Sequence, residues 1–281
     1  EIPEAKNYLI EGGMLFWVGF FLKRRYPGSK LFVYIPEPAF YLDERKSFFQ
    51  KLFFKFRMRM KRRAVEHFFV ITKMVESDAK KWLGDDISIS ILRYYVARIE
   101  RFEYSDYDTK ENNILFVIER PDNTGYVKGL DHAIKIFEKV NKKIPDAKLF
   151  LVGSGTELLQ YENKNILGMG YCNIEDVYKQ VKISIVPAVY DACVMTVPEA
   201  SLSGVVPIVS TNVGSKEFLP DSLVLELGDT DKWSDRIQTV LNYSSQEVEE
   251  LLGKPNQEFS LLTRDRILKG FKGEYAERSA K

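Results

Sequence analysis

The sequence contains few of the residues from which metal sites and disulfide frameworks are built. Its 281 residues include two cysteines, Cys172 and Cys193, and two histidines, His67 and His132. The cysteines form no C-x-x-C pair, which argues against a disulfide framework or a structural zinc site and favours a reducing compartment. His67 stands at the start of a predicted strand and His132 lies in a predicted helix, and we expect a structural role for each.

Neither sign of charge dominates, and no hydrophobic run is long enough to cross a bilayer. The 41 Lys and Arg residues are balanced by 40 Asp and Glu residues, so the net charge points to no partner. The longest apolar run, residues 14–22, is too short for a membrane span, and no signal-peptide pattern is present. We therefore expect a cytoplasmic protein. Because the chain begins with Glu1 and enters a predicted strand at once, we also expect a further N-terminal part to precede it.

Apolar periodicity divides the first half of the chain into alternating strands and helices. Strand-length apolar runs occupy 7–11, 30–37, 67–72 and 88–96. Helical stretches occupy 13–25, 46–64 and 77–84. We expect the last of these helices to begin at a capping residue, Ser77. The polar segment that follows, residues 102–112, has the composition of a linker.

A second series of strands and helices follows this segment. Its predicted strands are 113–119, 147–153, 165–170, 183–188, 206–210 and 223–227. Its predicted helices are 129–145, 174–181 and 198–203. Strands that alternate with helices are typical of parallel sheets covered on both faces. The sequence thus predicts an α/β protein with two Rossmann-like domains.

Candidate ligand-binding residues follow the strands of the second series, where open parallel sheets bind ligands. Arg120 and Lys128 follow the first strand, and we expect Lys128 at the head of the next helix. The turn 153–157, with sequence GSGTE, follows the second strand and opens a predicted helix, and Tyr171 and Cys172 follow the third. Cations and glycine turns at helix N-termini suit a diphosphate. Each signal alone also fits a solvated charge or an ordinary turn, but their joint placement favours a binding site.

Two carboxylates interrupt an otherwise apolar stretch near the end of the second series. Asp191 and Glu199 are separated by seven residues, and burying such groups is costly unless they find partners. Pro198 suits the first turn of a helix, which Thr196 or Val197 would cap, so Glu199 would lie near the positive helix end. From the spacing alone, two interpretations stay open. The acids bind a ligand, or Glu199 caps the helix while Asp191 forms a loop turn.

Several motifs in this half together resemble a known family. The stretch YDACVMTVPEASLSGVVPIVSTNVGSKEFL contains an acid, seven residues and a Glu-Ala pair, followed by Gly-Val-x-Pro. The pair ER ending at Arg120, the pair KG at 128–129 and the segment PDAKLFLVGSGTE accompany it. Over residues 113–228 this pattern resembles the retaining glycosyltransferases of the GT-B fold, specifically the group 4 family with its glycosyl transferases group 1 domain. In the first half, HFFVITKMVESDAKKWL is similar to the segment that precedes the interdomain linker of that family.

The resemblance implies a domain organisation. Two Rossmann-like domains would face a cleft, with residues 1–108 forming an incomplete acceptor-side domain and residues 109–256 forming the nucleotide-sugar-binding domain. Residues 257–281 would form a terminal helix that crosses back to the first domain. The implied activity is a hexosyltransferase-like transfer of a sugar from a nucleotide-diphosphate donor with retention. No metal and no cofactor are implied, in agreement with the lack of a histidine cluster.

The resemblance also implies roles for individual residues. Arg120 and Lys128 would neutralise the donor diphosphate, and Asp191 would hold hydroxyl groups of the donor sugar. Glu199 would accept a hydrogen bond from the ribose. Other implied donor-binding residues are Gly153, Gly155, Gly170, Tyr171, Cys172, Val194, Met195 and Thr196. Apart from the resemblance, the position of Glu11 at the end of the first predicted strand, beside Gly12 and Gly13, is typical of a turn residue, and the second interpretation is that it faces the cleft on the acceptor side.

The sequence departs from the family pattern where the donor sugar would bind. Asp191 stands where the family has Glu, and Ala192–Val194 replaces the common Gly-Phe-Gly. Added Cβ atoms limit how closely a backbone can approach a ligand. We expect an altered sugar preference, and a site with weakened activity is the second interpretation. A non-catalytic nucleotide-sugar-binding or scaffold protein is the alternative function.

Residues 46–63 combine eight Lys or Arg residues and five Phe residues with no acid. On a helix, one face would carry Phe49, Leu52, Phe53, Phe56 and Met60, and another would carry Lys51, Lys55, Arg59 and Arg62. This pattern is typical of a helix that lies on an anionic membrane surface, and it favours a lipid or lipid-linked acceptor at the cytoplasmic membrane face. A helix packed on the sheet with a solvated basic face is the alternative. Aromatic residues on one buried side argue against nucleic acid.

Overall fold

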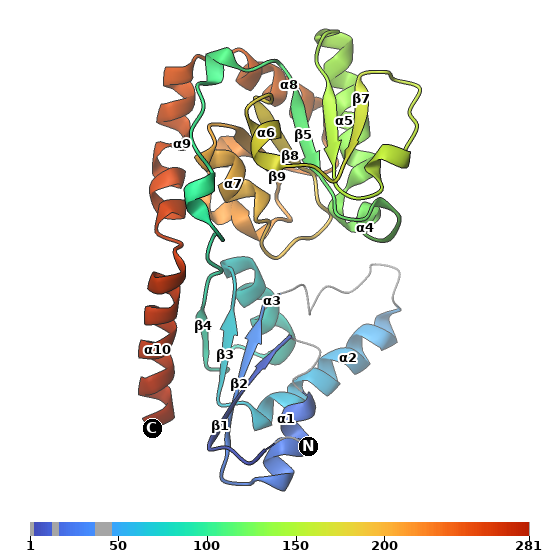
Figure 1. The fold of residues 1–281 in the computed structure, drawn as a ribbon. Helices are drawn as coiled ribbons and strands as arrows, with labels where there is room; N and C mark the ends of the chain where they lie inside the picture. Colours follow the sequence, from blue (N-terminus) through green and yellow to red (C-terminus); the bar gives the residue numbers. More distant parts are fainter. Residues whose placement is uncertain (1–2, 13–16, 37–46, 281) are drawn as a thin grey trace. The chain divides into compact units, whose positions relative to one another are not determined.

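The computed structural model describes residues 3–12, 17–36 and 47–280, which fall into two units (Figure 1). Unit 1 comprises residues 1–95 and 264–281, and unit 2 comprises residues 96–263. The units thus divide before the polar segment 102–112, whereas the sequence analysis placed the boundary at 108. The predicted helix residues 13–16 and Lys46 lie outside the described residues.

Unit 1 is a four-stranded parallel sheet with helices around it. Its strand order is β1-β2-β3-β4, with β1 at Asn7–Glu11, β2 at Lys30–Ile35, β3 at His67–Val70 and β4 at Ile89–Ile91. Its helices are α1 (Trp17–Arg25), α2 (Phe48–Lys61), α3 (Lys73–Leu83) and α10 (Arg264–Ala280). Phe271 of α10 packs on the sheet against Phe32, Tyr34 and Phe69, so the C-terminal helix belongs to the core of unit 1.

Two expectations for unit 1 are corrected by the structure. The cap of α3 is Thr72, whose hydroxyl accepts a hydrogen bond from the backbone N–H of Val75, so the helix begins before Ser77. The predicted strand 88–96 shortens to the three residues of β4. Among the described residues, β4 is an edge strand of this sheet and pairs with β3 alone, at Ile89, Ser90 and Ile91.

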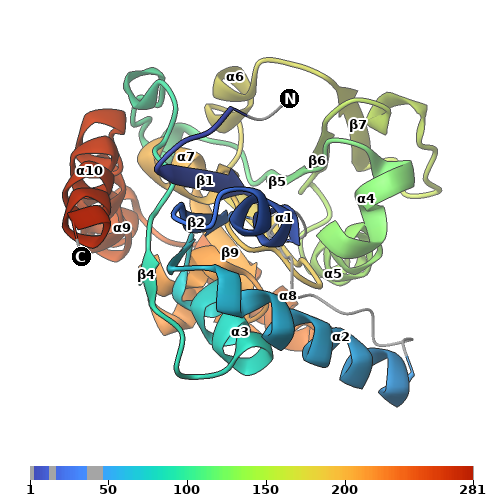
Figure 2. The same cartoon turned by 90° about the horizontal axis from the view of Figure 1, so that it is seen from below.

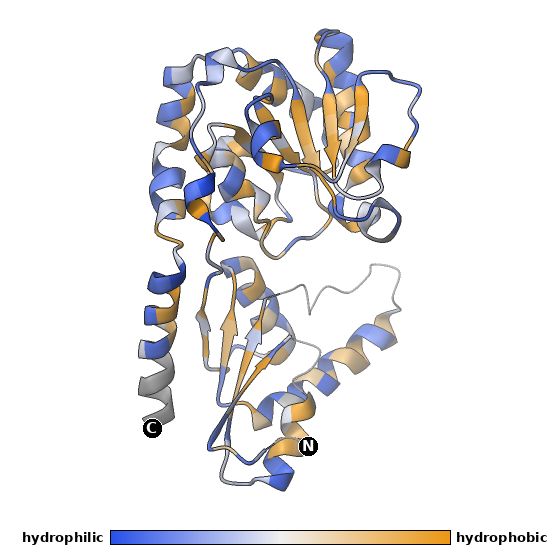
Figure 3. Ribbon diagram, in the orientation of Figure 1, coloured by the Kyte–Doolittle hydropathy of each residue, from blue (hydrophilic) through white to orange (hydrophobic). Residues whose placement is uncertain are grey.

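Unit 2 is a six-stranded parallel sheet in the order β10-β9-β8-β5-β6-β7. The strands are β5 (Ile114–Val117), β6 (Leu149–Val152), β7 (Ile166–Gly170), β8 (Ile183–Val186), β9 (Val206–Ser210) and β10 (Val224–Leu225). The helices are α4 (Pro121–Lys128), α5 (Leu130–Lys143), α6 (Ile174–Tyr178), α7 (Thr196–Leu202), α8 (Thr230–Leu241) and α9 (Ser245–Ser260). Figure 3 shows the strands of this sheet as predominantly hydrophobic ribbons.

Both faces of this sheet are buried, because neighbouring residues of one strand enter different cores. In β5, Ile114 and Phe116 join the larger core, which α5, α8 and α9 cover, whereas Leu115 joins a second core with Val177 and Tyr178 of α6. This alternation follows from the two-residue repeat of a strand. It explains why the strands read as continuous apolar runs in the sequence.

The order of the strands reverses between β5 and β8. From β5 the chain proceeds outward through β6 and β7, and it then returns to the other side of β5 to form β8, β9 and β10. Open parallel sheets bind ligands beyond the carboxyl ends of the two strands at such a switch point. The fold therefore directs attention to the residues that follow β5 and β8.

The segment expected to be a linker is part of unit 2. Tyr107 is fully buried, and its hydroxyl donates a hydrogen bond of 2.8 Å to the carbonyl of Val240. The ammonium of Lys110 is also buried and donates to the carbonyls of Ser203, at 2.8 Å, and Gly204, at 3.0 Å. The segment 102–112 is therefore anchored to unit 2 by specific hydrogen bonds of its two buried residues, while most of its other side chains are exposed.

Candidate functional site

The segment that follows β5 contacts the loop that follows β8. Arg120 is the N-cap residue of α4, and Lys128 is its last residue. The next residue, Gly129, has a φ of 80°, and a Cβ atom there would lie 1.8 Å from the carbonyl oxygen of Pro187. The N–H of Val189 also donates to the carbonyl of Val127 at 2.8 Å. This close approach brings the end of α4 to the loop that carries Asp191.

The structure adds a helix to the sequence-based placement of Lys128. As expected, Lys128 stands at the head of the following helix, directly before Gly129, the N-cap of α5, but it is also the last residue of α4. The helix α4 was missed because Pro121–Lys128 has no apolar stripe, although Pro121 at its first position is a typical start signal. The carboxyl end of a helix carries partial negative charge, which favours a cation there.

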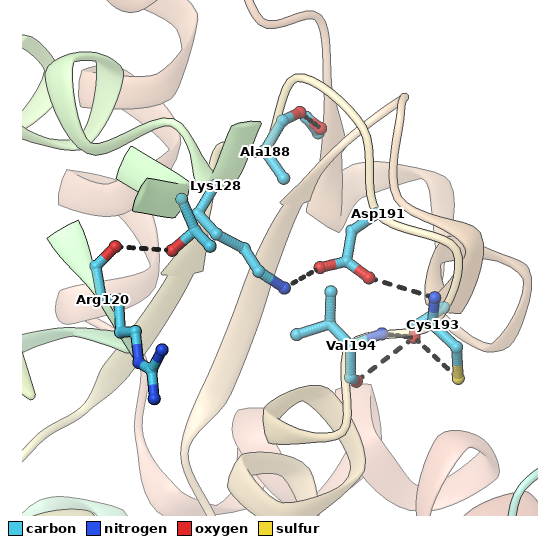
Figure 4. A network of polar contacts seen from close by, with 9 residues as sticks. Arg120, Lys128, Ala188, Asp191, Cys193 and Val194 are labelled. Atoms are coloured by element: carbon cyan, nitrogen blue, oxygen red, sulfur yellow. Dashed lines mark hydrogen bonds and ion pairs between the residues drawn. The ribbon is translucent and has the colours of Figure 1, made fainter. Parts of the chain in front are cut away.

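Lys128 and Asp191 form an ion pair, which Figure 4 shows at the centre of the site. Asp191 is 9% exposed, and its second carboxylate oxygen accepts a hydrogen bond of 3.1 Å from the N–H of Cys193. Its backbone joins Val213 through a parallel bridge. Both oxygens therefore have partners, which offsets the cost of burying the carboxylate.

Arg120 does not take part in this ion pair. The residue is exposed, and its backbone carbonyl accepts a hydrogen bond of 2.9 Å from the hydroxyl of Thr124. Figure 4 shows the guanidinium group at a distance from the Lys128–Asp191 pair. Within the part of the chain that the structure describes, this guanidinium forms no ion pair. The structure thus brings Lys128 and Asp191 together and leaves Arg120 beside them as an exposed cation.

Glu199 lies in the first turn of α7 and is half-buried. The helix begins at Thr196 with Met195 as its N-cap, so neither predicted cap residue occupies that position. The hydroxyl of Tyr178 donates a hydrogen bond of 3.3 Å to Oε2 of Glu199. Burial raises the pKa of Glu199 to about 7, against the lowering effect of this hydrogen bond and of Arg101. Burial likewise raises the pKa of Tyr178, so its hydroxyl stays a donor.

The loop between Asp191 and α7 is held by a serine that the sequence analysis did not single out. Ser215 Oγ accepts a hydrogen bond of 2.9 Å from the N–H of Val194 and lies 3.3 Å from its carbonyl oxygen. Ala192 is buried, and Val194 packs against the large core of unit 2. The motif NVGSKEFL, which contains Ser215, was noted as a resemblance, but only the folded chain shows that it supports the loop.

The glycine turn after β6 is ordered, but it does not open a helix. The segment Thr156–Leu158 forms a single 3₁₀ turn, so the helix expected after GSGTE is wrong. Gly153 has a φ of 139°, and a Cβ atom there would lie 1.7 Å from the carbonyl oxygen of Ile118 at the end of β5. The N–H of Gly155 binds the carboxylate of Glu157 at 3.0 Å. The turn is therefore pressed against β5, and one of its donors already contacts an anion of this chain.

The other predicted site residues occupy different environments. Gly170 ends β7 with a φ of 67°, and its N–H donates to the hydroxyl of the buried Thr156 at 2.9 Å. The next residue, Tyr171, is 91% exposed, whereas Cys172 is half-buried and burial raises the pKa of its thiol. Glu11 is exposed at the carboxyl end of β1 in unit 1.

The structure also bears on metals, on membrane spans and on a histidine. Among the described residues, no group of three or more His, Cys, Asp or Glu side chains could hold a metal ion. No helix in the described ranges is long and apolar enough to cross a membrane. His67 is buried, with its ring nitrogens 2.7 and 2.8 Å from the hydroxyls of Ser88 and Ser90.

Comparison with known proteins identifies the domain and the fold. Residues 111–243 match the family model described as Glycosyl transferases group 1, and no curated protein matches the chain. Among solved structures, sucrose-phosphate synthase from Thermosynechococcus elongatus has 15% identity and a TM-score of 0.74, over 98% of this chain and 74% of that one.

A trehalose-6-phosphate synthase and one further solved structure are also similar. One, from work on glycosyltransfer with retention using bisubstrate glycomimetics, has 11% identity and a TM-score of 0.77, over 98% of this chain and 74% of that one. The other, titled trehalose-6-phosphate from E. coli bound with UDP-2-fluoro glucose, has 12% identity and a TM-score of 0.72, over 97% and 73%. Residues 111–243 thus match a glycosyl transferases group 1 domain in a chain with the GT-B fold. The predicted group 1 domain, fold class and glycosyltransferase class are confirmed, whereas the group 4 family and retention stay predictions.

Proposed function

We propose that this chain is a retaining, metal-independent glycosyltransferase that uses a nucleotide-diphosphate sugar as donor. The observation that carries the proposal is the meeting of Lys128 and Asp191 beyond β5 and β8, the two strands at the switch point of the larger sheet. The similar structures support it, since one comes from work on glycosyltransfer with retention and another has UDP-2-fluoro glucose bound.

In this proposal, Arg120 and Lys128 bind the diphosphate and stabilise the charge that develops on it. Arg120 is exposed and forms no ion pair among the described residues. Its guanidinium can therefore donate two parallel hydrogen bonds to phosphate oxygens. The side chain of Lys128 is 38% exposed, and only one of the three donors of its ammonium is needed for Asp191. Cations positioned where a leaving group gains charge lower the barrier without a covalent intermediate.

The two acids, Asp191 and Glu199, would bind the donor sugar and the ribose of the nucleotide, respectively. Asp191 is held on both sides, and each carboxylate oxygen keeps acceptor capacity for a sugar hydroxyl. Glu199 Oε2 accepts from Tyr178, which leaves Oε1 for a ribose hydroxyl. Tyr171 and Cys172, after the edge strand β7, would lie against the base, and the turn Gly153–Gly155 would face the phosphates.

The loop Ala192–Val194 would set the sugar preference. Its side chains take part in the packing of unit 2, and Ser215 binds its backbone, so the loop is fixed in one shape. A fixed loop with Cβ atoms leaves less room beside Asp191 than a glycine-rich one. We infer that the preferred sugar differs from that of enzymes with Gly-Phe-Gly at this place.

On the acceptor side, we propose an acceptor that is lipid-linked or held at the cytoplasmic membrane face. The aromatic and basic helix α2 supports this part of the proposal, because its apolar side chains are exposed. Glu11, at the end of β1, would contribute on this side.

The activity is tested by donor hydrolysis and transfer with UDP, GDP and ADP sugars. We expect turnover of at least one donor, unchanged by a metal chelator, with the anomeric configuration retained. Arg120→Ala and Lys128→Ala should each lower kcat by about tenfold or more. Lys135→Ala, at an exposed lysine of α5, is the control and should retain the wild-type rate. Donor binding without turnover would favour a non-catalytic nucleotide-sugar-binding protein instead.

A further inference from the structure

The helix α2 presents its apolar side chains to solvent. Five side chains at helical spacing form one row, the exposed ridge: Phe49, Leu52, Phe53, Phe56 and Met60, which are 78%, 54%, 62%, 62% and 50% exposed. The ridge spans about 17 Å along the helix, at the usual rise per residue. Soluble proteins rarely expose a contiguous row of large apolar side chains without a binding partner.

The helix is attached to unit 1 through its opposite side. Met58 is 3% exposed, and the ring of Phe54 packs edge-to-face on Trp82 of α3 at 5.5 Å. Figure 2 shows α2 lying beside α3. A capping box at Ser47 and Gln50 fixes the first turn. The ridge is therefore not the packing face of the helix, which argues against the alternative that the aromatic face packs on the sheet.

Basic residues border the ridge on both sides. Lys51, Lys55 and Arg59 follow one flank at helical spacing, and Arg57 lies on the other, with its guanidinium 5.8 Å from the ring centre of Phe53. Residues 46–63 contain no acid that would neutralise this charge locally. Arg62, beyond the helix, is the exception in the group, since it is paired with Asp86.

We propose that α2 docks the protein on a membrane surface that contains anionic lipids. The ridge would enter the boundary between headgroups and acyl chains, while the flanking cations would contact the headgroup phosphates. Charge complementarity favours an anionic membrane as the partner, because the cations beside the ridge match anionic headgroups and the apolar ridge matches the acyl chains below them. The helix α1 adds the exposed Phe20 and, in its last turn, Arg24 and Arg25, whereas Lys23 of the same turn is paired with Glu66.

This inference deepens the acceptor side of the proposed function, but it rests on unit 1 and not on the donor site. Lipid binding is measured without donor or acceptor, so loss of transferase activity and loss of docking are separate results. If the chain binds vesicles but transfers no sugar, only the proposed function fails. If it transfers sugar but ignores vesicles, only the docking surface fails.

The test is vesicle flotation of the full chain. We expect binding to mixed phosphatidylcholine–phosphatidylglycerol vesicles, weaker binding as NaCl is raised, and no binding to pure phosphatidylcholine. Phe53→Ser/Phe56→Ser should lower the affinity by about tenfold or more, as should Lys51→Gln/Lys55→Gln/Arg59→Gln. Phe56→Trp should show a blue shift of its emission on binding, which reports insertion even if a double variant folds poorly.

The controls change the same kinds of residue elsewhere. Lys135→Gln/Lys142→Gln/Lys164→Gln removes equal charge from exposed positions of unit 2, and Leu261→Ser removes a 46%-exposed leucine. Both should bind as the wild type does. Equal losses in the charge control, or vesicle binding that survives the Phe53→Ser/Phe56→Ser change, would overturn the proposal. The proposal would also be overturned if the chain bound no vesicles but instead bound single-stranded RNA tightly, or formed a dimer in sedimentation, and the same phenylalanine changes abolished that interaction.

Discussion

At the scale of single residues, the site depends on which partners unit 2 provides for its buried carboxylates. Asp191 is paired on both oxygens, whereas Glu199 has one tyrosine hydroxyl to offset its burial. The sequence showed both acids in an apolar stretch and predicted that they would need partners. It did not reveal Tyr178 as the partner of Glu199, or Ser215 as the residue that holds the loop at Val194, because these residues come close only when the chain folds.

The ion pair of Lys128 and Asp191 predicts a loss of stability when one member is removed. Lys128→Ala should lower the free energy of unfolding by about 1–3 kcal/mol, because the buried carboxylate loses its cation. Lys128→Ala/Asp191→Asn should recover part of this loss, since no charge then remains unpaired. Urea unfolding curves of the two variants and the wild type give the comparison. Equal stability of the wild type and Lys128→Ala would show that the pair does not form in solution.

Glu199 predicts a dependence of stability on pH. Its pKa is raised from 4.5 to about 7, chiefly by burial, so the folded state holds its proton more tightly than the unfolded state does. The stability that this proton gives is full below the ordinary pKa and is lost as pH rises through about 7. Between these values, the wild type should therefore lose stability relative to Glu199→Gln. Chemical unfolding at several pH values measures the difference, and parallel profiles for the two proteins would refute the shifted pKa.

At the scale of elements, the strands of unit 2 were the most predictable parts of the chain. Strands such as β6, β8 and β9 are buried on both faces and have apolar runs of matching length. The helices α4, α8 and α9 were missed or seen only in part. Capping residues begin two of them, Asp229 for α8 and Ser244 for α9, so a closer search for caps would have found these starts.

The junction of α4 and α5 predicts the effect of a single methyl group. Gly129→Ala should destabilise the fold by more than about 2 kcal/mol, because its φ is 80° and the new Cβ would meet the carbonyl of Pro187. Gly125→Ala, inside α4, is the matched control, since the atom nearest to its new Cβ would be a Leu130 side-chain atom at 3.7 Å. Thermal unfolding should show a lower Tm for the first variant and an unchanged or higher Tm for the second. A small effect at Gly129 would mean that the junction does not press on β8.

At the scale of the whole molecule, the chain leaves unit 1 and returns to it. The terminal helix α10 clusters with residues 1–95, and the segment 102–112 is built into unit 2 through Tyr107 and Lys110. Composition alone indicated a linker at 102–112, because a polar segment that is hydrogen-bonded to a domain resembles one that is solvated. The division into two α/β units was nevertheless predictable, since each series of strands forms its own sheet.

All residues proposed to contact the donor belong to unit 2. Residues 96–263 form a compact unit with their own cores, so this piece alone should fold and bind the donor nucleotide. It should not transfer sugar, because the proposed acceptor side lies in unit 1. Heteronuclear NMR of residues 96–263 titrated with a nucleoside diphosphate checks both folding and binding. A well-folded piece that shows no shifts would argue that the donor site needs more of the chain.

The central claim is that the segments after β5 and after β8 bind a nucleoside diphosphate. Isothermal titration calorimetry of the full chain with UDP, GDP and ADP tests it most directly. We predict saturable binding of at least one of them, weakened by about tenfold or more in Arg120→Ala and in Lys128→Ala, with Lys135→Ala equal to the wild type. Binding that none of these substitutions alters, or no binding of any of the three diphosphates, would contradict the account.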